Sequence, residues 1–195
     1  MASIKTITTA YRGKLAEVYD EVRDKQARWH VENQTVDDML EKISAKYVLD
    51  MPVGTGRFIP LYRKLGMRGV GIDSSEAMLA HARRKNRGNV LTLRVGDALK
   101  LEYDKPTFDT CVCVRFFNLI EPEALAKVMR EISRVTTRHL ILTIRLGEQY
   151  HSNSSMATHN ERQFRALCTR LGWRVVHDKT ENFQKGWHLM QLERK

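Results

Sequence analysis

Two acids in the first half of the sequence each close a short apolar run, as residues do at the end of a buried strand. Asp50 ends the run YVLD, and Asp73 ends the run GVGID. Gly54 and Gly56 follow Asp50 within the stretch VLDMPVGTGRF. Glycine allows a tight turn and the close approach of a ligand, and a carboxylate about 20 residues further on can accept hydrogen bonds from ribose hydroxyls. The spacing therefore predicts a nucleoside-binding site at the end of the first strand.

Two common diphosphate-binding patterns are absent from the sequence. A dinucleotide-binding G-x-G-x-x-G would need a third glycine at position 59, where Ile59 stands, and no G-x-x-x-x-G-K-[ST] stretch occurs. These absences disfavour a nicotinamide-dependent oxidoreductase. They favour a nucleoside ligand without a pyrophosphate.

Short apolar runs alternate with helical patterns along the chain. Strands are expected at 47–51, 69–73, 91–97, 109–116, 139–145, 173–179 and 186–194. Helices are expected at 15–22, 36–43, 58–65, 75–86, 122–135 and 160–171. This alternation predicts a single α/β domain over residues 1–195, with a doubly wound, mostly parallel seven-stranded sheet, helices on both faces and an antiparallel last strand.

These motifs resemble those of class I S-adenosylmethionine (SAM)-dependent methyltransferases over roughly residues 47–145. That family closes its first strand with an acid and G-x-G-x-G, and here Pro52 replaces the first glycine. The stretch GVGIDSSEAML places Asp73 at the position of the ribose acid, and VGDALKL places Asp97 and Ala98 where such enzymes recognise adenine. The resemblance implies SAM as cofactor, S-adenosylhomocysteine (SAH) as product and residues 1–45 as a helical lid. The SAM contacts that it implies are Asp50, Pro52, Gly54, Gly56, Asp73, Ser74, Met78, Asp97, Ala98 and Arg115.

A methyl group on a sulfonium is already electrophilic, so such an enzyme mainly aligns the acceptor and excludes water. No obligatory catalytic residue is therefore expected. Candidates for substrate contact are Tyr19, which resembles a tyrosine that closes over SAM in this family, Asn118, and His151 in an expected loop after the fifth strand. The alternatives are packing of Tyr19 against Val18 and Val22 and a solvated His151.

Two arginines follow strand-like runs, and both are expected on the ligand side of the sheet. Arg115 follows DTCVCV, and Arg145 ends HLILTIR. Arginine pairs well with carboxylates and phosphates. The hypothesis is that Arg115 contacts the carboxylate of SAM or an acidic substrate, and the alternative is an ion pair with a surface acid.

The formal net charge of +10 raises the possibility of an anionic partner such as nucleic acid. The main basic cluster is HARRKNRG, residues 81–88, at the expected end of a helix. Cations there complement the helix dipole, and this end of the helix should lie opposite the ligand edge of the sheet. The sequence also has Arg115-Phe116-Phe117-Asn118 where methyltransferases of DNA amines carry [DNS]-P-P-[YF]. A small-molecule acceptor is favoured, with RNA, protein and a non-catalytic SAM-binding partner subunit as alternatives.

The three cysteines, Cys111, Cys113 and Cys168, lack metal-ligand spacing, and no metal site is expected. They are interpreted as reduced core thiols of a cytoplasmic protein. No apolar run approaches the roughly 20 residues of a membrane span, and the first residues lack the apolar core of a secretory signal.

Overall fold

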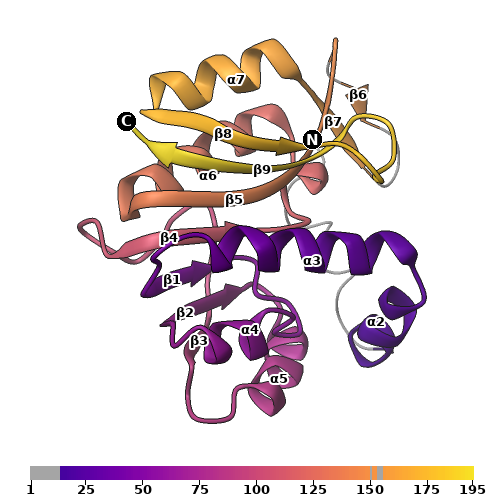
Figure 1. The fold of residues 1–195 in the computed structure, drawn as a ribbon, viewed down its shortest axis with the longest axis vertical. Coiled ribbons are helices and arrows are strands. Elements are labelled where there is room, and N and C mark those ends of the chain that lie inside the picture. Colours follow the sequence, from indigo (N-terminus) through magenta and orange to yellow (C-terminus); the bar gives the residue numbers. More distant parts are fainter. Residues whose placement is uncertain (1–13, 150, 153–155) are drawn as a thin grey trace. The chain divides into compact units, whose positions relative to one another are not determined.

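The computed structural model describes residues 14–149, 151–152 and 156–195. They form two compact units, divided between Asp97 and Ala98, and each unit has its own strands and helices (Figure 1). The prediction of a single domain over residues 1–195 stays a prediction.

The first unit is built on three parallel strands in the order β3-β2-β1. Its elements are α2 (Lys14–Asp24), α3 (Ala27–Glu41), β1 (Tyr47–Asp50), α4 (Ile59–Lys64), β2 (Arg68–Asp73), α5 (Glu76–Lys85) and β3 (Leu91–Val95). Asp50 pairs with Gly71 and Asp73 with Val95, so both acids lie at the carboxyl edge of this sheet. Ligands of α/β sheets bind at this edge.

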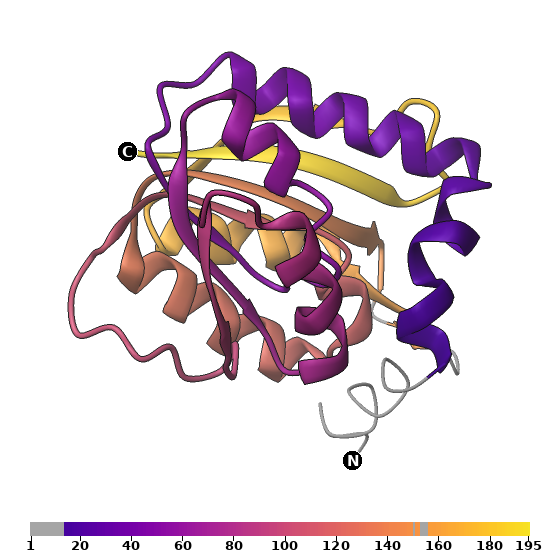
Figure 2. The same cartoon turned by 90° about the horizontal axis from the view of Figure 1, so that it is seen from below.

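A local sequence signal sets the start of helix α5. Ser75 caps this helix, since its side chain accepts a hydrogen bond from the Met78 N–H. The helix pair α2 and α3 is separated by a short turn, and α2 lies across the end of α3 rather than in line with it (Figures 1 and 2). Helices α2, α4 and α5 fall where helical spacing predicts them, whereas α3 begins at Ala27, well before the predicted start at residue 36, and ends at Glu41.

The second unit is built on the strand order β4-β5-β9-β8. Its elements are β4 (Phe108–Cys113), the 3-10 helix η1 (Phe117–Leu119), α6 (Pro122–Val135), β5 (Thr136–Gly147), β6 (His151–Ser152), β7 (Ala157–Asn160), α7 (Glu161–Arg170), β8 (Trp173–Lys179) and β9 (Trp187–Arg194). Strand β5 runs parallel to β4, while β9 is antiparallel to both β5 and β8. Figure 2 shows α6 and α7 on one side of these strands. The predicted antiparallel last strand is confirmed.

Two features of the second unit differ from the sequence-based prediction. The segment after the fifth strand, expected as a loop, contains β6 and β7, and β7 extends the sheet by pairing with Leu146 and Gly147 of β5. Strand β5 is also longer than predicted, so Arg145 lies inside it and is paired with Trp187 of β9. Backbone pairing with β7 and β9 extends the strand beyond its most apolar stretch.

The three cysteines are buried, as the sequence predicts. Burial raises the pKa of Cys168 to about 12, which leaves this thiol unreactive at neutral pH. Among the described residues, none of the helices is both long and apolar enough to cross a membrane.

Candidate functional site

The chain leaves β1 at Asp50 and turns through residues 51–56, here termed the glycine loop, before entering α4. Gly54 and Gly56 have φ angles of 54° and 75°, which glycine adopts without strain. A Cβ atom on Gly56 would lie 2.7 Å from the Ile59 side chain and 3.0 Å from the backbone of Ala82. A Cβ atom on Gly54 would meet nothing within 4 Å. Gly56 is thus required because any larger side chain would clash with Ile59 and Ala82. Gly54 has open space beside it, so a ligand can approach its backbone.

Asp73 joins the glycine loop to the start of α5. One carboxylate oxygen accepts a hydrogen bond from the Gly54 N–H at 2.9 Å, and the other accepts one from the Ser75 N–H at 2.8 Å. Burial raises the pKa of Asp73, and backbone hydrogen bonds from Ser75, Gly54 and Ser74 act against this rise. A carboxylate offers about four acceptor positions, so this structural role leaves acceptor capacity for ribose hydroxyls.

Asp50 lies next to this arrangement and is only 2% exposed. Its carboxyl group accepts a hydrogen bond from the Tyr62 hydroxyl at 3.1 Å. Burial raises the pKa of Asp50 to about 8, although the Tyr62 hydrogen bond and the charge of Arg57 oppose the rise and Asp73 adds to it. Asp50 is therefore largely protonated at neutral pH, and a cation bound nearby would favour its carboxylate form.

The Asp50 pKa predicts how the stability of the protein depends on pH. Between about pH 4 and about pH 8 the folded protein retains a proton on Asp50 that the unfolded chain has released, so this group lowers stability as pH rises. Asp50→Asn cannot release a proton, and we expect the stability of this variant relative to the wild type to increase across that range. Urea unfolding of both proteins at several pH values measures the difference, with the exposed Asp38→Asn as control. Parallel pH profiles for Asp50→Asn and the wild type would contradict the assignment.

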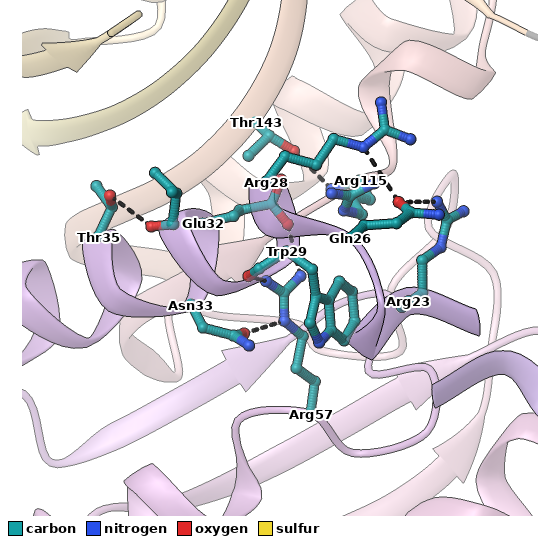
Figure 3. Close-up of polar contacts among 11 residues, drawn as sticks. Arg23, Gln26, Arg28, Trp29, Glu32, Asn33, Thr35, Arg57, Arg115 and Thr143 are labelled. Carbon is teal, nitrogen blue, oxygen red and sulfur yellow. Dashed lines mark hydrogen bonds and ion pairs between the residues drawn. The ribbon is translucent and has the colours of Figure 1, made fainter. Parts of the chain in front are cut away.

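Arg57, directly after the glycine loop, attaches helix α3 to that loop (Figure 3). Its guanidinium group forms an ion pair with Glu32 at 2.5 Å, and the two side chains are 10% and 0% exposed. It also donates hydrogen bonds to the Asn33 side chain and the Trp29 carbonyl, and lies 3.5 Å from the centre of the Trp29 ring. This buried ion pair fixes α3 above the start of α4.

Helix α2 is attached to the same loop through Asp20. Its carboxylate accepts a hydrogen bond from the Thr55 hydroxyl at 2.6 Å and pairs with Lys85 at 2.5 Å. The predicted contact residue Tyr19 packs against Trp29 in an edge-to-face arrangement, with 6.2 Å between ring centres. Packing with Trp29 thus replaces the alternative of packing with Val18 and Val22, both of which are exposed.

The other predicted SAM contacts in the first unit lie close to Asp73 in the chain. Ser74 is exposed directly after β2, and Met78 is buried in the first turn of α5. Asp97 is exposed just beyond the end of β3. Pro52 lies in the glycine loop, with a cis peptide bond to Met51. The structure thus groups the first-unit candidates along the carboxyl edge of β1, β2 and β3.

The remaining candidates belong to the second unit. Ala98 is its first residue, and Arg115 follows β4 with a positive φ of 59° and a backbone N–H that donates to the Thr143 hydroxyl at 2.6 Å (Figure 3). Asn118 lies on η1, is 5% exposed, and has a side-chain oxygen with no hydrogen-bond partner in the described part of the chain. The backbone of His151 lies in β6, but its side chain is outside the described residues. The roles of these four residues stay predictions.

Sequence reasoning missed several residues of this arrangement, among them Asp20, Glu32, Thr55 and Arg57. A signal for Glu32 was present, since it lies three residues after Trp29 and four before Val36 on the buried face of α3. An acid on such a face needs a buried partner. His159 was also missed, and it is buried with Nε2 2.7 Å from the Phe117 carbonyl oxygen.

The basic cluster at 81–88 is partly neutralised by ion pairs. Arg83 pairs with Glu76, and Lys85 pairs with Asp20. Lys85 pairs with the same carboxylate that accepts the hydrogen bond from Thr55. These pairings weaken the case for nucleic-acid binding by this cluster.

No metal site is evident in the described residues, where no three His, Cys, Asp or Glu side chains are grouped so that they could hold an ion.

The family described as "Methyltransferase domain" matches residues 48–139 of the chain. The chain is also similar to the solved structure of magnesium protoporphyrin IX methyltransferase from Synechocystis PCC 6803 with bound SAM, with 18% identity, a TM-score of 0.79 and 100% of each chain covered. A second similar structure is 1,6-didemethyltoxoflavin-N1-methyltransferase from Burkholderia thailandensis, with 15% identity, a TM-score of 0.73 and coverage of 100% of this chain and 92% of that chain. A search of curated protein sequences finds no match.

These findings agree with the resemblance to class I SAM-dependent methyltransferases, from which the enzyme class and the methyl donor are predicted. They also confirm the predicted fold, a doubly wound, mostly parallel sheet with antiparallel final strands and surrounding helices.

Proposed function

We propose that this protein transfers the methyl group of SAM to a small-molecule acceptor in the cytoplasm and releases SAH. The observation that carries the proposal is the hydrogen bonding of Asp73 to Gly54 and Ser75. It holds an acidic group and an open glycine backbone together at the edge of the sheet where nucleosides bind.

Within the first unit, we assign the SAM contacts to the groups around this edge. The Asp73 carboxylate accepts hydrogen bonds from the ribose hydroxyls, and the backbone at Gly54 approaches the ligand closely. Asp50 responds to positive charge on the ligand by losing its proton. The remaining proposed contacts in this unit are Pro52, Gly56, Ser74, Met78 and Asp97.

We assign a lid role to α2 and α3, within residues 1–45. The buried pair of Arg57 and Glu32 supports this assignment, because it makes α3 a fixed neighbour of the glycine loop. The more exposed pair of Asp20 and Lys85 holds α2, and exposed pairs are weak. Helix α2 is therefore the part of the lid that opens most easily for cofactor exchange.

A small-molecule acceptor is supported by two observations. Two basic residues of the cluster at 81–88 form ion pairs with acids of the same chain, so less of its charge is available to a polyanion. The similar enzymes from Synechocystis and Burkholderia thailandensis are named for small-molecule substrates. SAM supplies an electrophilic methyl group, so the contribution of the chain is alignment of the acceptor and exclusion of water.

The test uses SAM carrying a labelled methyl group, incubated with the protein and a cell extract. We expect the label in the soluble, low-molecular-weight fraction, where mass spectrometry can identify the methylated compound. Label in acid-precipitable material that ribonuclease or protease releases would contradict a small-molecule acceptor. SAM binding without any transfer would favour a non-catalytic binding subunit.

A further inference from the structure

Two arginines and a tryptophan meet at the carboxyl edge of β4 and β5 in the second unit. Arg145 of β5 is the register partner of Trp187 at the start of β9, so both side chains point to the same face of the sheet. The guanidinium carbon of Arg115 lies 5.7 Å from the centre of the Trp187 ring. Arg115 therefore lies beside the Trp187 ring, and Arg145 extends from the same face of the sheet as that ring.

The backbone holds this group in a fixed arrangement. Thr143 lies two residues before Arg145 on the same face of β5, and its hydroxyl accepts the hydrogen bond from the Arg115 N–H. This bond holds Arg115 in a left-handed backbone conformation, with φ at 59°. Residues other than glycine adopt that conformation rarely, and such strain concentrates at functional sites.

Arg145 has an unsatisfied donor. Its Nε atom is buried and has no hydrogen-bond partner, and no ion pair of Arg145 occurs among the described residues. A buried donor without an acceptor is unfavourable. The arrangement therefore has the chemistry of an anion site, in which a planar guanidinium can form two parallel hydrogen bonds to a carboxylate or phosphate.

We propose that Arg145, together with Arg115 beside Trp187, binds a carboxylate or phosphate group of a reactant. The proposal rests on the proposed function, and it makes the acceptor of the methyl group an anionic small molecule. Trp187 would form the apolar wall of the site, because its ring lies beside the Arg115 guanidinium group.

The first experiment needs no knowledge of the acceptor. Inorganic phosphate is titrated into the wild-type protein at constant ionic strength, and tryptophan fluorescence is recorded. We expect a saturable change that is lost in Trp187→Phe, and an apparent Kd that rises by about tenfold or more in Arg145→Met. Arg170→Met, an equal loss of charge on the exposed last turn of α7, should behave like the wild type.

The proposal fails if the wild type gives no saturable change, or if Arg145→Met binds phosphate as the wild type does. Because this titration contains no SAM, its failure is separate from a failure of the proposed methyl transfer. Arg145→Lys refines the test, because it keeps the charge but loses the paired donors, and we expect it to recover only part of the affinity.

A second measurement tests whether the anion belongs to the acceptor. We expect Arg145→Met to bind SAM with the affinity of the wild type in a calorimetric titration, and to transfer less label to the soluble fraction. A loss of SAM affinity of about tenfold or more, or label transfer equal to that of the wild type, would contradict an anionic acceptor at this site.

Discussion

Asp73→Ala is expected to lower the affinity for SAM by about 100-fold or more, because hydrogen bonds to a charged group contribute about 1.5–3 kcal/mol each. The variant loses the proposed bonds to the ribose hydroxyls. It also releases the Gly54 N–H, which Asp73 holds at 2.9 Å, so that the glycine loop is no longer fixed. Isothermal titration with SAM measures the change in affinity.

The control for this variant is Asp38→Ala, which removes an exposed acid from α3 without touching the glycine loop. Circular dichroism of both variants establishes that secondary structure is retained. Asp73→Asn should fall between Asp73→Ala and the wild type, since an amide has one acceptor oxygen where the carboxylate has two. SAM affinity that is unchanged in Asp73→Ala would remove the assignment of this carboxylate.

Arg57→Met is expected to lower the free energy of unfolding by about 3–5 kcal/mol, the cost of breaking a buried ion pair from one side. The variant leaves the Glu32 carboxylate, which is 0% exposed, without the guanidinium group that neutralises it. It also removes the contact between Arg57 and the ring of Trp29. Equilibrium unfolding in urea measures the loss.

A double variant separates charge from packing at this position. Arg57→Met combined with Glu32→Leu removes both charges, and we expect it to recover much of the lost stability, because apolar replacement of a buried pair is often nearly neutral. Lys64→Met is the matched control, since Lys64 pairs with Glu41 at the surface, with the two side chains 70% and 44% exposed. Its effect should stay within about 1 kcal/mol. Equal effects of Arg57→Met and Lys64→Met would contradict the buried-pair interpretation.

The sequence predicted the elements whose signals are local. Ser75 and Asn160 cap α5 and α7 at the starts of the predicted helices 75–86 and 160–171, and the apolar run after Phe108 forms β4. The order of an acid, glycines and a second acid placed Asp50 and Asp73 at one edge of a sheet, because parallel strands bring their carboxyl ends together.

Features that depend on distant residues could not be predicted in this way. Lys85 and Asp20 are 65 residues apart, and Arg57 and Glu32 are 25 apart, so neither pairing has a local signal. The strands of the segment after β5 were missed for a similar reason. His151–Ser152 forms a strand only by pairing with β7, which in turn pairs with the end of β5.

The most direct test of the central claim is a calorimetric titration of the wild-type protein with SAM, SAH and NAD⁺. We predict saturable binding of one SAM per chain, competition by SAH for the same site and no binding of NAD⁺, because Ile59 stands where a dinucleotide site needs its third glycine. Absence of SAM binding, or saturable binding of NAD⁺ that excludes SAM, would contradict the assignment of the glycine loop and Asp73 to a methyltransferase cofactor site.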